Sequence, residues 1–70
     1  MTEKTYLPHQ QRVIEEKREL DAKVTALSNF IGLNKTFETI DATEQERLLE
    51  QCEIMWQYSE ILGARIAAFE

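Results

Sequence analysis

The 70-residue sequence has too little cysteine and histidine for a covalently linked or metal-held core. Cys52 is its one cysteine, so no disulfide can form within the chain. His9 is its one histidine, and a single histidine with one distant cysteine does not make a zinc site, which normally needs four close ligands. A domain of ~60 residues buries only ~60% of the surface that its unfolded chain exposes. Self-association is the remaining route to stability.

Membrane and targeting signals are also missing. No apolar run approaches the ~18 residues of a membrane-spanning helix. The polar N-terminus lacks the apolar core of a signal peptide. A single unpaired cysteine is typical of a reducing compartment. We therefore expect a cytoplasmic protein with no membrane partner.

Positive charge is scarce, since the formal net charge is -5 and the sequence pI is about 4.8. Such a chain does not offer the broad basic surface that binds polymeric nucleic acid. A compact anion site depends on local geometry and not on total charge. A small anionic ligand held by a few cations therefore stays open.

Helix-breaking residues are few, and they predict where the first helix begins and ends. Pro8 suits the first turn of a helix, and Gly32 stands where a C′ glycine would end it. Between them, apolar residues recur at spacings of three and four with one gap at Lys17, namely Val13, Leu20, Val24, Leu27 and Ile31. We predict a short N-terminal arm, a helix over about 8–31 and a connection over 32–42.

A second helix is predicted over about 43–69, starting at a capping box of Thr43 and Glu46. Its main apolar stripe is interrupted by Ser59 and contains Leu48, Cys52, Met55, Leu62, Ile66 and Phe69. A second stripe holds Ile54, Tyr58, Ile61 and Ala68 and is interrupted by Arg65. A helix in a hairpin buries one stripe against its partner, so the surplus predicts further contacts. The fold class is all-α: one domain over 1–70, an antiparallel two-helix hairpin that assembles through 61–69 into a homo-oligomer.

Catalytic machinery is not visible. The sequence has no glycine-rich phosphate loop, no nucleophile motif and no metal-ligand spacing. Its many glutamates fit a solvated helix face, because the pattern implies no cleft. We expect no enzymatic activity, no metal and no cofactor.

Two residues near the start of the first helix are candidates for contact with an anionic ligand. His9 lies where free backbone N–H groups attract anions. It is either an exposed first-turn histidine or a ring that stacks on a base or donates to a phosphate. Tyr6 either packs on a nucleobase or packs as a hydrophobic staple or against a neighbouring chain.

Three further residues have a structural and a functional interpretation. Lys23 flanks the apolar stripe, where a lysine commonly covers apolar surface with its alkyl stem. The Thr25 hydroxyl bonds within its own helix or reaches a ligand. Arg65 is the lone cation in an apolar segment, and such a charge needs a partner. That partner is either a glutamate of another chain or a phosphate.

Several runs of the sequence resemble a known family. The run from Pro8 to Lys17, followed by Glu19 to Lys23 and by Phe30 and Ile31, looks like the start of a small phage protein. The second half is similar at Glu46, Arg47, Leu48, Gln51, Met55, Tyr58, Leu62, Arg65 and Ile66. The family is the phage anti-CBASS cyclic-oligonucleotide sponges of the second described type, which are related to a small crAss-phage protein. The resemblance covers nearly the whole chain.

The resemblance implies a function and a set of sites. Family members are helical hexamers that bind cyclic dinucleotides, and often cyclic trinucleotides, made by bacterial CBASS immunity, and sequester them uncleaved. The dinucleotide site lies between paired protomers near the N-terminal helical region. At that site, His9 corresponds to a base-stacking aromatic that is often tyrosine, and Lys23 to a phosphate contact. Tyr6 and Pro8 lie beside His9.

The trinucleotide site of the family is separate and lies nearer the symmetry axis. Thr25 and Arg65 correspond to positions at that site. The resemblance places the protein in the cytoplasm of the infected bacterial host, with cyclic oligonucleotides and its own copies as partners. The alternative hypothesis is a small helical protein-interaction module whose second helix docks into a host or phage protein. A hydrolase of cyclic nucleotides has no motif in its favour.

Overall fold

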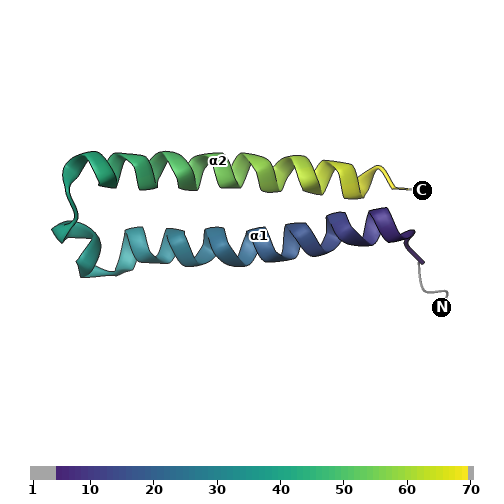
Figure 1. Ribbon diagram of the computed structural model, residues 1–70, viewed down its shortest axis with the longest axis horizontal. Helices are drawn as coiled ribbons and strands as arrows, with labels where there is room; N and C mark the ends of the chain where they lie inside the picture. Colours follow the sequence, from purple (N-terminus) through teal and green to yellow (C-terminus); the bar gives the residue numbers. More distant parts are fainter. Residues whose placement is uncertain (1–4, 70) are drawn as a thin grey trace.

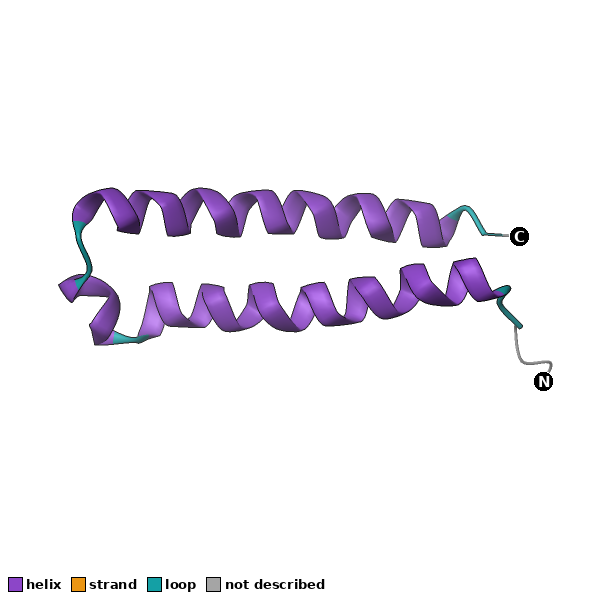
Figure 2. Cartoon of the chain, in the orientation of Figure 1, coloured by secondary structure: helices purple, strands orange, loops and turns teal. Residues whose placement is uncertain are grey.

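The chain reverses direction once and forms a hairpin of two long helices. The computed structural model describes residues 5–69. Helix α1 (Pro8–Leu33) and helix α2 (Ala42–Ala67) lie antiparallel, and a short 3-10 helix, η1 (Lys35–Thr39), joins them (Figure 1). Both ends of the described chain lie at the open end, and helix accounts for nearly all of it (Figure 2). The predicted all-α hairpin is confirmed.

Helix α1 begins as predicted but does not end at glycine. Pro8 occupies its first turn, and the backbone N–H of Leu7 donates to the Gln10 side chain at 2.9 Å. The helix continues through Gly32. No residue in the described range, glycine included, has a positive φ. The prediction of a C′ glycine is therefore wrong. Asn34 ends the helix in an extended conformation, and its side chain accepts from the Thr36 N–H at 2.9 Å.

The turn between the helices is bonded to both of them. The rings of Phe30 and Phe37 meet edge to face, with centroids 6.1 Å apart. The side-chain amide of Gln45 donates to the carbonyl oxygens of Phe37 at 2.8 Å and Ile40 at 3.0 Å. The Phe37 carbonyl also accepts from the Ile40 N–H at 3.2 Å, so Gln45 adds a second donor there and bonds the Ile40 carbonyl as well. These bonds also fix where α2 starts relative to α1.

Helix α2 begins one residue earlier than predicted, because a different residue caps it. Asp41 is the N-cap, and its side chain accepts from the Thr43 N–H at 3.1 Å. The predicted capping box of Thr43 and Glu46 is wrong, since Thr43 already lies inside the helix. Aspartate and threonine both cap helices, but the carboxylate of Asp41 is the stronger acceptor and comes first in the chain. The helix ends at Ala67.

One seam between the helices contains the core. The buried apolar side chains are Val13, Leu20, Val24 and Leu62. Met55, Ile66 and Phe69 pack against the cluster that Val13, Leu20 and Leu62 form. These residues belong to the main apolar stripe predicted for each helix. The two stripes face each other, as an antiparallel hairpin requires. The molecule measures 51 × 19 × 16 Å, which is two helices wide and one helix deep. Side chains away from the seam therefore stay at the surface.

The polar interruptions of the two stripes meet inside this seam. The Lys17 ammonium donates to Asp21 at 2.8 Å and to the Ser59 hydroxyl at 2.9 Å. The Ser59 hydroxyl donates to the other carboxylate oxygen of Asp21. Ser59 is buried, whereas Lys17 and Asp21 are partly exposed. Because each group has a partner, the network crosses the seam without an unsatisfied polar atom and sets one register between the helices.

The network changes the acidity of Asp21. Hydrogen bonds from Lys17 and then Ser59 stabilise the ionised carboxylate and lower the pKa of Asp21 below its ordinary value of 3.8, although partial burial opposes this. The Asp21 side chain is 41% exposed, so solvent weakens the ion pair. The folded state therefore holds this carboxylate ionised at lower pH than the unfolded chain does.

The observed cap predicts unequal effects of two substitutions. Asp41→Ala should lower the free energy of unfolding by ~1 kcal/mol, because the first turn of α2 loses its side-chain acceptor. Thr43→Ala, the matched control, should cost less than half as much. Urea denaturation followed by circular dichroism measures both. A larger loss of stability in Thr43→Ala than in Asp41→Ala would show that Thr43 and Glu46 form the capping box in solution.

The lowered pKa of Asp21 predicts a pH dependence. Because the folded carboxylate releases its proton more readily, its contribution to stability is present above about pH 4 and is lost as the pH falls through the folded pKa. Between about pH 5 and pH 2, the free energy of unfolding of the natural protein should fall more steeply than that of Asp21→Asn. If the free energies of unfolding of the two proteins, measured by urea titration, fall in parallel with pH, the network is contradicted.

Candidate functional site

The predicted dinucleotide residues lie along one side of α1. His9 and Lys23 are exposed and fourteen residues apart, which is close to four full turns. They therefore point to the same side, but their backbone positions are separated by ~21 Å along the helix. A base stacked on His9 and the phosphate of the same nucleotide cannot also reach Lys23 of that chain. One chain does not bring the two residues together.

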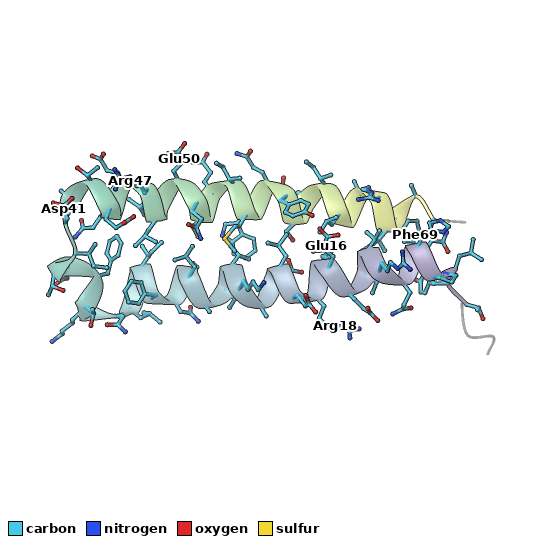
Figure 3. All side chains as sticks on the ribbon, in the orientation of Figure 1. Glu16, Arg18, Asp41, Arg47, Glu50 and Phe69 are labelled. Carbon is cyan, nitrogen blue, oxygen red and sulfur yellow. The ribbon has the colours of Figure 1, made fainter. Side chains whose placement is uncertain are left out.

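The N-terminal arm is held by a ring contact at the open end of the hairpin. The Tyr6 ring meets Phe69 edge to face, with centroids 6.1 Å apart. Phe69 lies beside the start of α1 in Figure 3. Pro8 follows the arm and is exposed at the helix start. The contact joins Tyr6, just before α1, to the residue that follows α2, within the same chain.

The predicted trinucleotide residues lie on opposite flanks of the hairpin. The Lys17 stem passes Gly63, where an added Cβ would lie 3.4 Å from Lys17 Cε, so these two residues mark one flank. Arg65, two residues after Gly63, lies about 200° farther round α2 and faces the other flank. Thr25 lies beyond Lys17 towards the turn, on the first flank. Along the hairpin axis Thr25 and Arg65 are roughly 18 Å apart.

His9 and two arginines lie towards the open end of the hairpin, and one of them, Arg12, was not among the residues predicted from the sequence. Arg12 lies one helical turn after His9, and its position on α1 places it on the flank that carries Arg65. Ion pairs in residues 5–69 join Lys17 with Asp21 and Arg47 with Glu44. His9, Arg12 and Arg65 therefore have no carboxylate partner there. The spacing of one helical turn between His9 and Arg12 was the sequence signal that could have identified Arg12. The flank on which Arg12 lies can be assigned only from the packed hairpin.

The other flank contains an open groove with different chemistry. It encloses about 580 Å³ and is lined by Ser28, Ile31, Gly32, Leu49, Cys52, Glu53, Trp56, Gln57 and Glu60. Cys52 is half-buried there. The charged residues of the lining are the two glutamates, and carboxylates repel phosphate. This groove therefore suits an apolar or cationic occupant better than an anionic one.

No group of three or more metal-ligating side chains occurs within residues 5–69. Over the same range, neither helix is long and apolar enough to cross a membrane.

Comparisons with known proteins agree on one family. The chain matches the family model Sequestin over residues 7–68. It is also 47% identical over 64 residues to an uncharacterized 7.5 kDa protein from the denB–rIIB intergenic region of Enterobacteria phage T4, with 91% of this chain and 98% of the relative covered. No solved structure matches significantly. The chain therefore belongs to the Sequestin family, the sponge-type anti-CBASS proteins of phages.

Proposed function

We propose that this protein binds and sequesters the cyclic dinucleotide messengers of bacterial CBASS defence, and cyclic trinucleotides at a second site, without cleaving them. The observation that carries the proposal is the family match over residues 7–68, which spans both helices and the turn. The exposed cations Arg12, Lys23 and Arg65 support it, since none of them has a carboxylate partner in the described chain. The messenger is taken up in the cytoplasm of the infected host.

The dinucleotide site forms between two chains. His9 and Lys23 of one chain are ~21 Å apart, so a nucleotide that uses both must take them from different copies. A two-fold interface presents each residue twice, once from each chain. A cyclic dinucleotide has two bases and two phosphates, so one messenger fits two stacking rings and two ammonium groups. Tyr6 and Pro8 flank His9 and complete the wall.

The trinucleotide site depends on symmetry in the same way. Thr25 and Arg65 lie on opposite flanks, so one copy cannot direct both at one ligand. A ring of chains brings Arg65 from several copies around an axis, where the guanidinium groups repel one another unless an anion lies among them. A cyclic trinucleotide supplies three phosphates to such a ring. Thr25 hydroxyls contribute from neighbouring copies.

Self-association belongs to this function, and the surface of the hairpin supports it. Five large apolar residues of α2 are exposed, namely Leu49, Ile54, Trp56, Tyr58 and Ile61. The core buries four apolar side chains of the described residues, which is little for a chain of this length. The family resemblance implies that the assembly is a hexamer. Within the predicted interface of 61–69, Ile66 and Phe69 pack against the chain's own core, and Ile61 is left for contact.

The same exposed residues favour a second candidate function. An amphipathic helix with uncovered apolar positions can dock into a groove of another protein. In that case the protein would be a helical interaction module acting on a host or phage protein, and it would bind no nucleotide. Titration with messengers distinguishes the two functions.

Titration calorimetry tests the proposed binding directly. The natural protein should bind a cyclic dinucleotide at about one messenger per two chains, and should also bind a cyclic triadenylate. Lys23→Ala should weaken dinucleotide binding by ~10-fold or more, and Arg65→Ala should weaken trinucleotide binding more than dinucleotide binding, because each variant removes charge-assisted hydrogen bonds.

Two exposed cations away from the proposed sites provide matched controls. Lys35→Ala, in η1, and Arg18→Ala, which projects from α1 away from α2 (Figure 3), should leave both affinities unchanged. If the folded protein gives no binding heat with either messenger, the sponge function is rejected and the interaction module is favoured. Unchanged binding in both Lys23→Ala and Arg65→Ala would reject the sites alone.

Recovery of the messenger tests sequestration against cleavage. A cyclic dinucleotide should be returned intact when the protein is denatured after a long incubation, since the proposed site contains cations and an aromatic ring but no nucleophile or metal. Chromatography and mass spectrometry of the released ligand provide the measurement. Linear product in amounts that grow with incubation time would show a hydrolase.

A further inference from the structure

One row of side chains on α2 is left uncovered by the hairpin. Ile54, Tyr58, Ile61 and Arg65 follow one another at steps of four, three and four residues, and all four are exposed. At about 100° per residue they occupy a sector of ~60°, which lies roughly 100° round the helix from the seam. The row is here called the outer stripe. Apolar residues that recur at such steps are the pattern by which one helix packs along another.

The outer stripe is complementary to itself about a two-fold axis. Such an axis, perpendicular to α2, sets the α2 helices of two copies antiparallel, and the contact closes on those two copies. With the axis between residues 59 and 60, Ile61 of each copy faces the partner's Tyr58, so two aliphatic–aromatic contacts form the centre. At each end, Gln51 faces the partner's Ala68, and neither residue carries a charge.

The residues towards the ends of α2 select this register. If the axis moved by half a heptad towards the turn, Arg65 would lie opposite the partner's Arg47, and like charges repel each other. If it moved equally far towards the open end, Ile54 would lie opposite a level beyond Ala67, where α2 ends. Among these three registers, the one with its axis between residues 59 and 60 covers every apolar residue of the outer stripe and opposes no like charges.

The same register gives Arg65 a partner. Within residues 5–69, Arg65 has no carboxylate at ion-pair distance. Because a helical side chain leans towards the N-terminal turn, Arg65 leans over its own Ile61 and towards the partner's Tyr58. A guanidinium group that lies over the face of a tyrosine ring is attracted by the electrons of that ring. Its N–H donors point outwards in its own plane, so they remain available to an anion.

We propose that two copies pair through the outer stripe, with antiparallel α2 helices related by a two-fold axis between residues 59 and 60. The occupant of the stripe is a second copy of this chain, and the hexamer that the family resemblance implies contains three such pairs. Tyr58 is a positioning residue, which acts on a cyclic trinucleotide through the partner's Arg65. The inference rests on the self-association and the role of Arg65 in the proposed function, and it specifies the surface and a further residue.

Distances between spin labels test the axis. In a Cys52→Ser background, Glu50→Cys, Gln57→Cys and Ala64→Cys each carry one label at an exposed position beside the outer stripe. At about 1.5 Å per residue, the two labels of a pair should be separated along α2 by ~29 Å at residue 50, ~8 Å at residue 57 and ~14 Å at residue 64. Electron paramagnetic resonance should therefore give its shortest separation at residue 57 and its longest at residue 50. Equal separations would show parallel helices, and any other order would show another axis, so either result overturns the proposal.

Two substitutions of Tyr58 test its role. Tyr58→Ala should raise the dissociation constant of the assembly at least ~10-fold in sedimentation velocity, and it should weaken the binding of cyclic triadenylate, because Arg65 loses the ring. Tyr58→Phe is the matched variant that keeps the ring face, so both constants should stay within ~3-fold of those of the natural protein. Tyr58 is exposed, so both variants should keep their helical circular dichroism. Weak binding of cyclic triadenylate by both variants, or an unchanged assembly in Tyr58→Ala, would overturn the proposal.

A charge at the centre of the contact provides a second variant. Ile61→Asp places a carboxylate opposite the partner's Tyr58 and should raise the dissociation constant of the assembly at least ~10-fold, because the pairing buries that charge without a partner. Arg18→Asp changes an exposed residue that projects from α1 away from α2 (Figure 3), and as the control it should leave the mass unchanged. An Ile61→Asp protein that assembles as the natural protein does would contradict the pairing.

The outcomes separate the pairing from the sponge. A natural protein that is a monomer would overturn the pairing, whatever the titrations show. An assembly that responds to the Tyr58 and Ile61 substitutions as expected but binds neither messenger would reject the proposed function and leave the pairing of copies standing.

Discussion

Two helices lying side by side share one seam, and this constraint determines the rest of the molecule. The hairpin is one helix deep, so a side chain is either in the seam or at the surface. Val24 and Leu62 are fully buried in it, whereas Trp56 and Ile61 on the flanks of α2 remain about half exposed. A chain of this size with so small a core is marginal alone. Its uncovered flanks are therefore the surfaces that the proposed binding and assembly would use.

The seam explains what the sequence could predict. Apolar periodicity identified both helices and the stripes that face each other, because burial acts on every turn of a helix. It did not identify the meeting of Lys17, Asp21 and Ser59, although Lys17 and Ser59 were the visible breaks in the stripes. Pairing two breaks requires the register between the helices. The errors at Gly32 and Thr43 arose where two local end signals compete within a few residues and only the folded chain selects one.

The candidate site was less predictable for a physical reason. His9, Lys23, Thr25 and Arg65 came from their chemistry and from family resemblance, and a single hairpin leaves them spread over ~20 Å and two flanks. A site assembled by symmetry leaves no sign of closeness within one chain. Arg12 was missed because its flank depends on how α1 packs. Within residues 5–69, one copy does show a separation of chemistry: Arg12 and Arg65, which have no carboxylate partner, lie on one flank, and an apolar groove that contains two glutamates lies on the other.

We propose that copies of this chain jointly enclose a messenger that no single copy can hold. Native mass spectrometry of the purified protein, with and without a cyclic dinucleotide, tests assembly and binding in one experiment. The account predicts a multimer that gains one intact messenger for every two chains. A monomer, or a multimer whose mass is unchanged by the messenger, would contradict it.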